Sequence, residues 1–166
     1  MIAHGRPRSS IRAATWIQCW TSWPRISSSY GRFWFWIEAL GEQARLFAFE
    51  PAEPFEPTRW LGQGDRVDVG EVTLQVRHCP GHTPGHVIFF NEPARFAIVG
   101  DVLFKGSIGR TDFPMGNHAD LINAITGKLW PLGGETMFVP GHGEMSSFAY
   151  ERATNPYVAD SVRGKA

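Results

Sequence analysis

Three side chains that can bind a metal ion, His82, Asp101 and His142, each follow a short apolar run of the sequence, and a glycine directly precedes each of them. Imidazole nitrogens and carboxylate oxygens are the usual ligands of zinc and related first-row metals. A glycine beside a ligand lets a metal ion and a substrate approach the backbone closely. The pattern therefore predicts a metal site of the hydrolytic kind, with the alternative that both histidines are ordinary loop residues and that Asp101 only forms a turn.

The elements that must position these side chains are short strands and one helix. Apolar and alternating patterns predict strands over residues 62–69, 72–77, 87–90, 96–99 and 136–139, the first two joined by a turn at residues 69–71. Residues 119–129 carry Leu121, Ile122, Ile125 and Leu129 at helical spacing. Sheet, helix and then a strand that ends in a histidine loop predict a layered α/β domain.

Five ordered motifs carry a family resemblance. They are residues 79–86 (Cys-Pro-Gly-His-Thr-Pro-Gly-His), 100–104 (Gly-Asp-Val-Leu-Phe), 109–114 (Gly-Arg-Thr-Asp-Phe-Pro), 139–143 (Val-Pro-Gly-His-Gly), and Glu151-Arg152 with Asn155-Pro156. The chain from about residue 33 to residue 158 resembles the metallo-β-lactamase superfamily, and within it the glyoxalase II-like thioester hydrolases. Several motifs in order are far more specific than one short pattern.

The resemblance implies a fold, a cofactor and a reaction. The fold class is α/β, a metallo-β-lactamase-like αββα sandwich, which we expect to be N-terminally incomplete here. The cofactor is zinc, two ions in the intact family, with iron or manganese as alternatives. His82 then serves the first metal, His142 the second and Asp101 both, and Asp101 is also the catalytic residue. The expected reaction is hydrolysis of a small-molecule thioester such as an acylglutathione, with metal-activated water attacking the carbonyl.

One part of the family pattern is missing from this sequence. The family opens with His-x-His-x-Asp-His, which supplies ligands to both metals, but no His-x-His pair occurs here and the only histidine before His78 is His4. A catalytic zinc usually has three protein ligands, whereas the matched positions supply three for two metals. We therefore expect weak metal binding and impaired catalysis in this chain.

Residues 1–32 form a leader that does not resemble folded sequence, and residues 33–166 form the C-terminal portion of the domain. The first 36 residues hold five arginines and no acidic residue. An organellar transit peptide and a basic arm for nucleic acid are two interpretations. We favour a third, an out-of-frame translation, because residues 8–24, with G or C at most third codon positions, can be read two nucleotides downstream as a strand end, an Asp-Pro-Gly-Gly turn and a helix start. The DNA upstream of Phe33 tests this hypothesis.

The remaining candidate residues have structural interpretations. Arg110 and Asp112 lie in a predicted loop, where we expect them to pair with each other, with a substrate contact as the alternative. His86 is expected to support the site without binding metal. Cys79 is expected to be a small packed side chain.

Composition limits the other function classes. The formal net charge is +0, and two cysteines do not make a disulfide framework. We therefore expect a cytoplasmic protein with neither a nucleic-acid nor a membrane partner. The sequence does not set its oligomeric state.

Two alternatives to a thioester hydrolase stay open. One is a persulfide dioxygenase-like protein with one non-haem iron, held by two histidines and a carboxylate. The other is a non-catalytic, truncated remnant.

Overall fold

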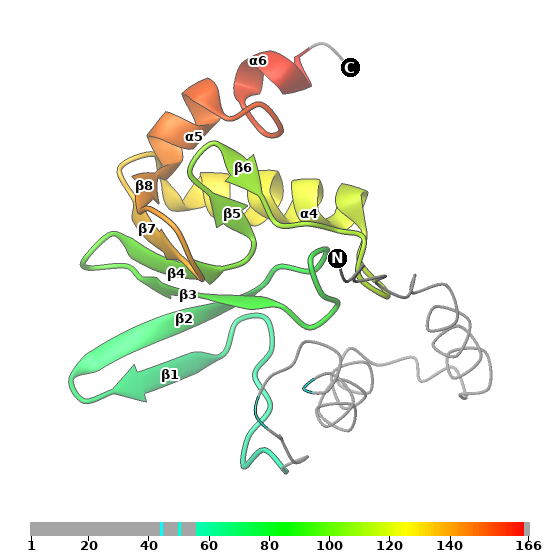
Figure 1. The fold of residues 1–166 in the computed structure, drawn as a ribbon. Coiled ribbons are helices and arrows are strands. Elements are labelled where there is room, and N and C mark those ends of the chain that lie inside the picture. The colour runs from blue at the N-terminus through cyan, green and yellow to red at the C-terminus, as the bar shows by residue number, and fades with distance from the viewer. Residues whose placement is uncertain (1–43, 45–49, 51–55, 165–166) are drawn as a thin grey trace, which may run out of the picture.

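A computed structural model of the chain describes residues 56–164 together with Ala44 and Glu50 (Figure 1). The predicted leader, residues 1–32, lies outside the described residues. No helix in the described part has the length and apolar content needed to cross a membrane.

A six-stranded mixed sheet forms the centre of the described part. Its strand order is β1-β2-β3-β4-β7-β8, and all neighbours are antiparallel except β4 and β7, which are parallel. A separate two-stranded hairpin, β5-β6, lies beside it (Figure 1). The strands are β1 (Arg66–Val69), β2 (Val72–His78), β3 (Val87–Asn91), β4 (Phe96–Gly100), β5 (Leu103–Phe104), β6 (Ser107–Ile108), β7 (Met137–Pro140) and β8 (Ser146–Ser147).

The helices within residues 56–164 lie on one side of this sheet (Figure 1). Helix α4 (His118–Ala124) begins at Asn117, whose side chain accepts a hydrogen bond from the backbone N–H of Asp120. It continues through one π-helical turn (Ile125–Leu129) into a 3₁₀ turn (Trp130–Leu132). Ser147 caps α5 (Phe148–Thr154) in the same way as Asn117 caps α4, and α6 (Asp160–Arg163) ends the described chain.

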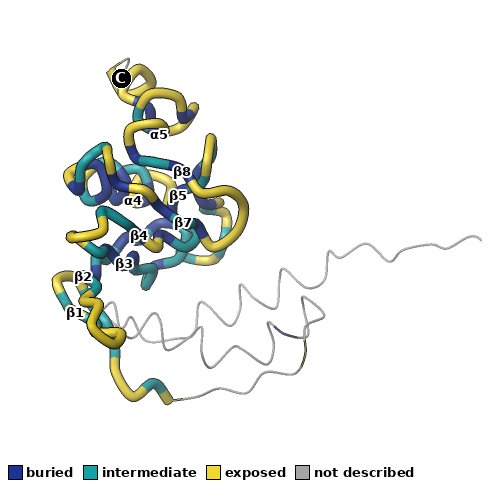
Figure 2. Tube along the Cα trace, turned by 90° about the vertical axis from the view of Figure 1, so that its left-hand side faces the viewer, coloured by how far each residue is buried: buried dark blue, intermediate teal, exposed yellow. Residues whose placement is uncertain are grey.

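The core lies between the sheet and the helices. Alternate residues of the strands, including Ile88, Ala97 and Phe138, are fully buried, as are Leu121 and Ile125 on the helical side. Figure 2 shows this buried interior beneath α4. The opposite face of the sheet also carries apolar side chains, and none of the helices within residues 56–164 covers it (Figure 1).

Ile98 and Met137 on that second face remain 42% and 43% exposed. The described residues thus supply one sheet and one helical layer of the expected sandwich.

Most predicted elements form, with shifted ends. The first hairpin turns at residues 69–71 as predicted, but β1 begins at Arg66 because residues 62–65 form a turn in which Asp65 accepts the Gly62 N–H. Residues 109–113 form a loop, as predicted. The β5-β6 hairpin, β8 and α5 were not predicted, because two-residue strands and a seven-residue helix show too little periodicity.

Candidate metal centre

His82 lies in the glycine-rich loop between β2 and β3, with its side chain 12% exposed. Its Nδ1 lies 2.8 Å from the backbone oxygen of Arg110. A carbonyl oxygen only accepts hydrogen bonds, so Nδ1 carries the proton and the Nε2 of the neutral ring presents a lone pair. A carbonyl contact of this kind is how proteins orient histidines that bind metals.

Asp101 follows β4 directly, and its Oδ2 lies 3.6 Å from Nε2 of His82. With the neutral imidazole, both atoms are acceptors and neither can donate to the other. Metal bonds of about 2.0–2.2 Å at a tetrahedral centre separate two ligand atoms by about 3.4 Å. One cation shared by His82 and Asp101 fits this arrangement.

Two glycines make room for Asp101. A Cβ at Gly141 would lie 2.2 Å from Oδ1 of Asp101, and a Cβ at Gly109 would lie 2.0 Å from its backbone oxygen. The Gly141 N–H also donates to the backbone oxygen of Gly100, which ties the loop of His142 to the loop of Asp101. The glycines beside the predicted ligands therefore have a steric role.

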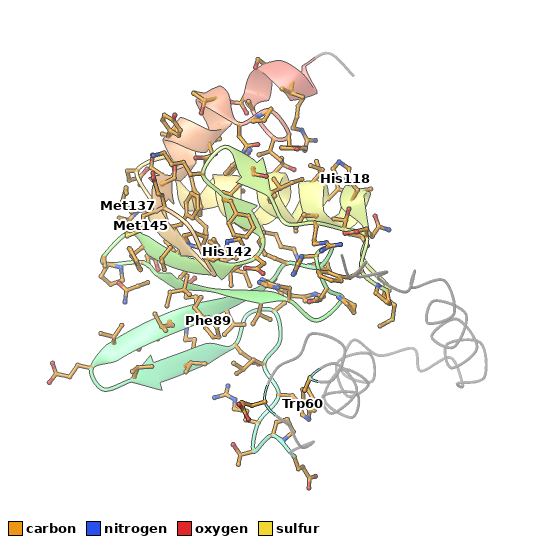
Figure 3. The ribbon with its side chains drawn as sticks, viewed as in Figure 1. Trp60, Phe89, His118, Met137, His142 and Met145 are labelled. Atoms are coloured by element: carbon orange, nitrogen blue, oxygen red, sulfur yellow. The ribbon has the colours of Figure 1, made fainter. Side chains whose placement is uncertain are left out.

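His142 lies after β7 (Figure 3). Its ring contacts the ring of Phe104, with 4.5 Å between the centroids and a tilt of 32°. His82, Asp101 and His142 all line one cavity of about 950 Å³. Within residues 56–164, however, no group of three His, Cys, Asp or Glu side chains is close enough to hold one metal ion. The structure brings His82 and Asp101 together and places His142 on the wall of the same cavity.

Two ion pairs flank this cavity. Arg110 donates to both carboxylate oxygens of Asp112, at 2.6 and 2.5 Å, so the pair expected from the sequence forms. Hydrogen bonding to the Arg110 guanidinium lowers the pKa of the Asp112 carboxyl to about 2. Lys105 on the β5-β6 hairpin pairs with Glu144, 2.5 Å away.

Sequence reasoning missed several cavity-lining side chains, namely Phe104, Lys105, Glu144, Tyr150 and Thr154. The first two belong to a hairpin that the sequence did not predict. Tyr150 and Thr154 belong to α5, which was not predicted either. The available signal was position, because Phe104 and Lys105 lie within four residues of Asp101.

Two of the other described histidines, His86 and His78, have local partners. His86 lies behind His82, with Nε2 3.3 Å from the backbone oxygen of Val99, and burial lowers the pKa of its ring. His78 contacts the backbone oxygen of Pro84 at 2.8 Å. His118 begins α4 and lies well apart from His142 (Figure 3). The position of His86 is consistent with a supporting role next to His82.

Cys79 is fully buried at the end of β2, and burial raises the pKa of its thiol to about 12 despite the nearby charges of Lys128 and Arg77. A Cys19→Ser variant keeps Cys79 as its one thiol. Because the thiolate is the reactive form, we expect Cys79 in this variant to react with a thiol reagent at pH 8 at least about 100-fold more slowly in the native protein than in denaturant. Timing of the reaction by absorbance tests this. Equal rates in both states would show that Cys79 is accessible.

Comparisons of the sequence and of the structure with known proteins agree on one family. The model of the metallo-beta-lactamase superfamily matches residues 21–142. Hydroxyacylglutathione hydrolase GloC of Haemophilus influenzae is 40% identical over 125 residues, which are 75% of this chain and 59% of that protein. The mitochondrial persulfide dioxygenase ETHE1 of Mus musculus is 35% identical over 100 residues, covering 58% of this chain and 39% of that protein.

A solved structure, TTHA1623 in a di-iron-bound form, superposes with a TM-score of 0.66 at 36% identity. The match covers 74% of this chain and 59% of that one. The chain spans between half and three fifths of the length of the curated relatives that it matches first. The similarity therefore concerns part of each relative.

Proposed function

The chain belongs to the metallo-beta-lactamase superfamily, and from this premise we propose that its site is that of a glyoxalase II-like, metal-dependent thioester hydrolase. The observation that carries the proposal is the pair His82 and Asp101. Their facing acceptor atoms, 3.6 Å apart on the wall of an open cavity, fit one shared cation. The similarity to a hydroxyacylglutathione hydrolase supports the thioester as the substrate class.

Each residue has a distinct role in this proposal. His82 and Asp101 would hold the first ion, and Asp101 and His142, which line the same cavity, would hold the second one. A bound zinc or iron supplies Lewis acidity at the reacting carbonyl. The Arg110 backbone oxygen keeps the His82 ring in the orientation that turns Nε2 to the cavity. Arg110, paired with Asp112, and Lys105, paired with Glu144, line the cavity in which a substrate would bind.

We propose further that this chain binds metal weakly and hydrolyses thioesters slowly. The proposed ligand set has three members for two ions, and the described residues contain no group of three close ligands. The His-x-His-x-Asp-His pattern of the family is absent from the sequence. Two protein ligands per ion are fewer than catalytic zinc sites use.

A second candidate is oxidation of a persulfide at one non-haem iron. The similarity to a persulfide dioxygenase and to a di-iron-bound structure favours it. Two histidines and one carboxylate are also the ligands that non-haem iron oxygenases use. Oxygen consumption with glutathione persulfide supports this candidate, whereas thiol release from S-lactoylglutathione supports the hydrolase.

Metal titration tests the proposed ligands. We expect Co²⁺ to bind the metal-free chain with low affinity, and His82→Ala and Asp101→Ala each to weaken that binding by at least about 10–100-fold, because each change removes a direct ligand. Visible absorbance of the bound cobalt measures the affinity. His118→Ala is the matched control, since His118 is an exposed histidine outside the cavity.

The control should bind Co²⁺ as the unchanged chain does. Equal affinity in the unchanged chain and in His82→Ala would remove His82 from the site. Circular dichroism of each variant verifies that the fold is kept, so that lost binding reports the ligand.

A further inference from the structure

Glu151 is a charged residue with no exposed surface, and it lies on α5 outside the cavity. Its carboxylate accepts three hydrogen bonds: Oε1 from the Ser146 hydroxyl at 2.5 Å, and Oε2 from the Gly106 N–H at 2.9 Å and from the Asn155 amide at 2.8 Å. A buried carboxylate is costly unless such donors satisfy it. The three donors come from three different segments, which Glu151 therefore joins.

Asn155, also fully buried, completes the connection. Besides Glu151, its amide nitrogen lies 3.1 Å from the backbone oxygen of Ser107 and 3.5 Å from that of Phe104. Its side-chain oxygen accepts the Tyr157 N–H at 3.0 Å. Asn155 thus binds both strands of the β5-β6 hairpin, and Glu151 binds the turn between them.

The hairpin needs this support. Each of its strands has two residues, and two pairs hold them together, Leu103 with Ile108 and Phe104 with Ser107. An isolated hairpin of this kind is marginally stable in water. Side-chain hydrogen bonds from α5, more than 40 residues away in the sequence, fix it against the rest of the fold.

The hairpin in turn shapes the candidate metal centre. Residues 104–108 line the cavity, and Phe104 is the ring against which His142 packs. We propose that Glu151 and Asn155 are positioning residues that hold the β5-β6 hairpin, and through Phe104 orient the imidazole of His142 for metal binding. The metal part of this inference rests on the proposed function, whereas the positioning of the hairpin and of His142 does not.

Amide hydrogen exchange at Gly106 tests the first step of the inference, that Glu151 holds the β5-β6 hairpin. In Glu151→Ala the Gly106 N–H loses a charged acceptor, so its exchange should become about 10–100-fold faster, the factor that corresponds to one hydrogen bond to a charged group. Glu151→Gln should restore slow exchange, because its carbonyl oxygen can accept from Gly106 and Asn155 while its amide donates to Ser146. Nuclear magnetic resonance measures the exchange in the full chain.

Arg152→Ala is the matched control. Arg152 is the next residue on α5 and pairs with Asp160 on α6, away from the hairpin. The Arg152→Ala variant therefore reports how far a general weakening of α5 accelerates amide exchange at Gly106. Exchange no faster in Glu151→Ala than in Arg152→Ala would overturn the positioning role of Glu151.

The second step of the inference is that the hairpin orients His142 through Phe104. It is tested by the contact between these two rings and by metal affinity. We expect the nuclear Overhauser effect between Phe104 and His142 to be lost in Glu151→Ala and kept in Glu151→Gln. Co²⁺ affinity should fall by at least about 10-fold in the first variant only, as for other groups that orient ligands. A retained ring contact in Glu151→Ala would overturn the inference. If the unchanged chain bound no Co²⁺, the proposed function would fail, and the exchange and ring-contact results would still decide the positioning role.

Discussion

Replacing residues 1–32 with a segment that carries His-x-His-x-Asp-His should raise the zinc affinity of the chain by more than about 100-fold. Loss of groups that only orient ligands already costs about 10–100-fold, and this segment would add several direct ligands to His82, Asp101 and His142. With three or more protein ligands at a metal, thioester hydrolysis should also appear. Competition with a coloured zinc chelator measures the affinity, and thiol release from S-lactoylglutathione measures the activity.

The control is the same segment with its histidines changed to alanine. It should leave the chain with its original weak binding, and His82→Ala in the histidine-bearing version should abolish hydrolysis. Tight zinc binding in the chain as it stands, or equal affinity with and without the added histidines, would contradict the conclusion that the missing motif limits this site.

The sequence predicted the central strands well because their patterns are local. The strands β3 and β4 are short continuous apolar runs, within which burial alternates, so that Ile88 and Val99 face the core. In the same way, Asn117 before an apolar helical pattern explains where α4 begins. Such signals depend on neighbours in the chain and not on the tertiary fold.

Long-range partners set what the sequence did not predict. Glu151 and Asn155 belong to a recognised motif, but no local pattern shows that their side chains bind a hairpin more than 40 residues earlier. Similarly, the family resemblance implied that His82 and Asp101 share a metal, while the carbonyl of Arg110 that orients His82 comes from another loop. Residue types identified the candidate ligands, and only the fold reveals what holds them.

The glycine in front of His82 is likewise explained by a long-range partner and not by its neighbours in the chain. Gly81 has a φ of +132°, and a Cβ there would lie 2.4–2.5 Å from the backbone nitrogen, Cα and Cβ of Leu121. Leu121 is fully buried in α4, so neither partner can move away cheaply. The loop of His82 therefore rests directly on the helix, and the Asn117 N–H also donates to the Gly81 oxygen at 2.8 Å.

Gly81→Ala should accordingly lower the free energy of unfolding by about 2–6 kcal/mol, the sum of ~1–3 for a strained backbone and ~1–3 for overpacking. Gly70→Ala is the matched control, because Gly70 also has a positive φ, +61°, but an added Cβ meets nothing within 4 Å. That variant should lose only about 1–2 kcal/mol. Urea unfolding measures both. Equal losses would mean that contact with Leu121 adds nothing, whereas a larger loss at Gly81 would show that α4 holds the loop of His82 in place.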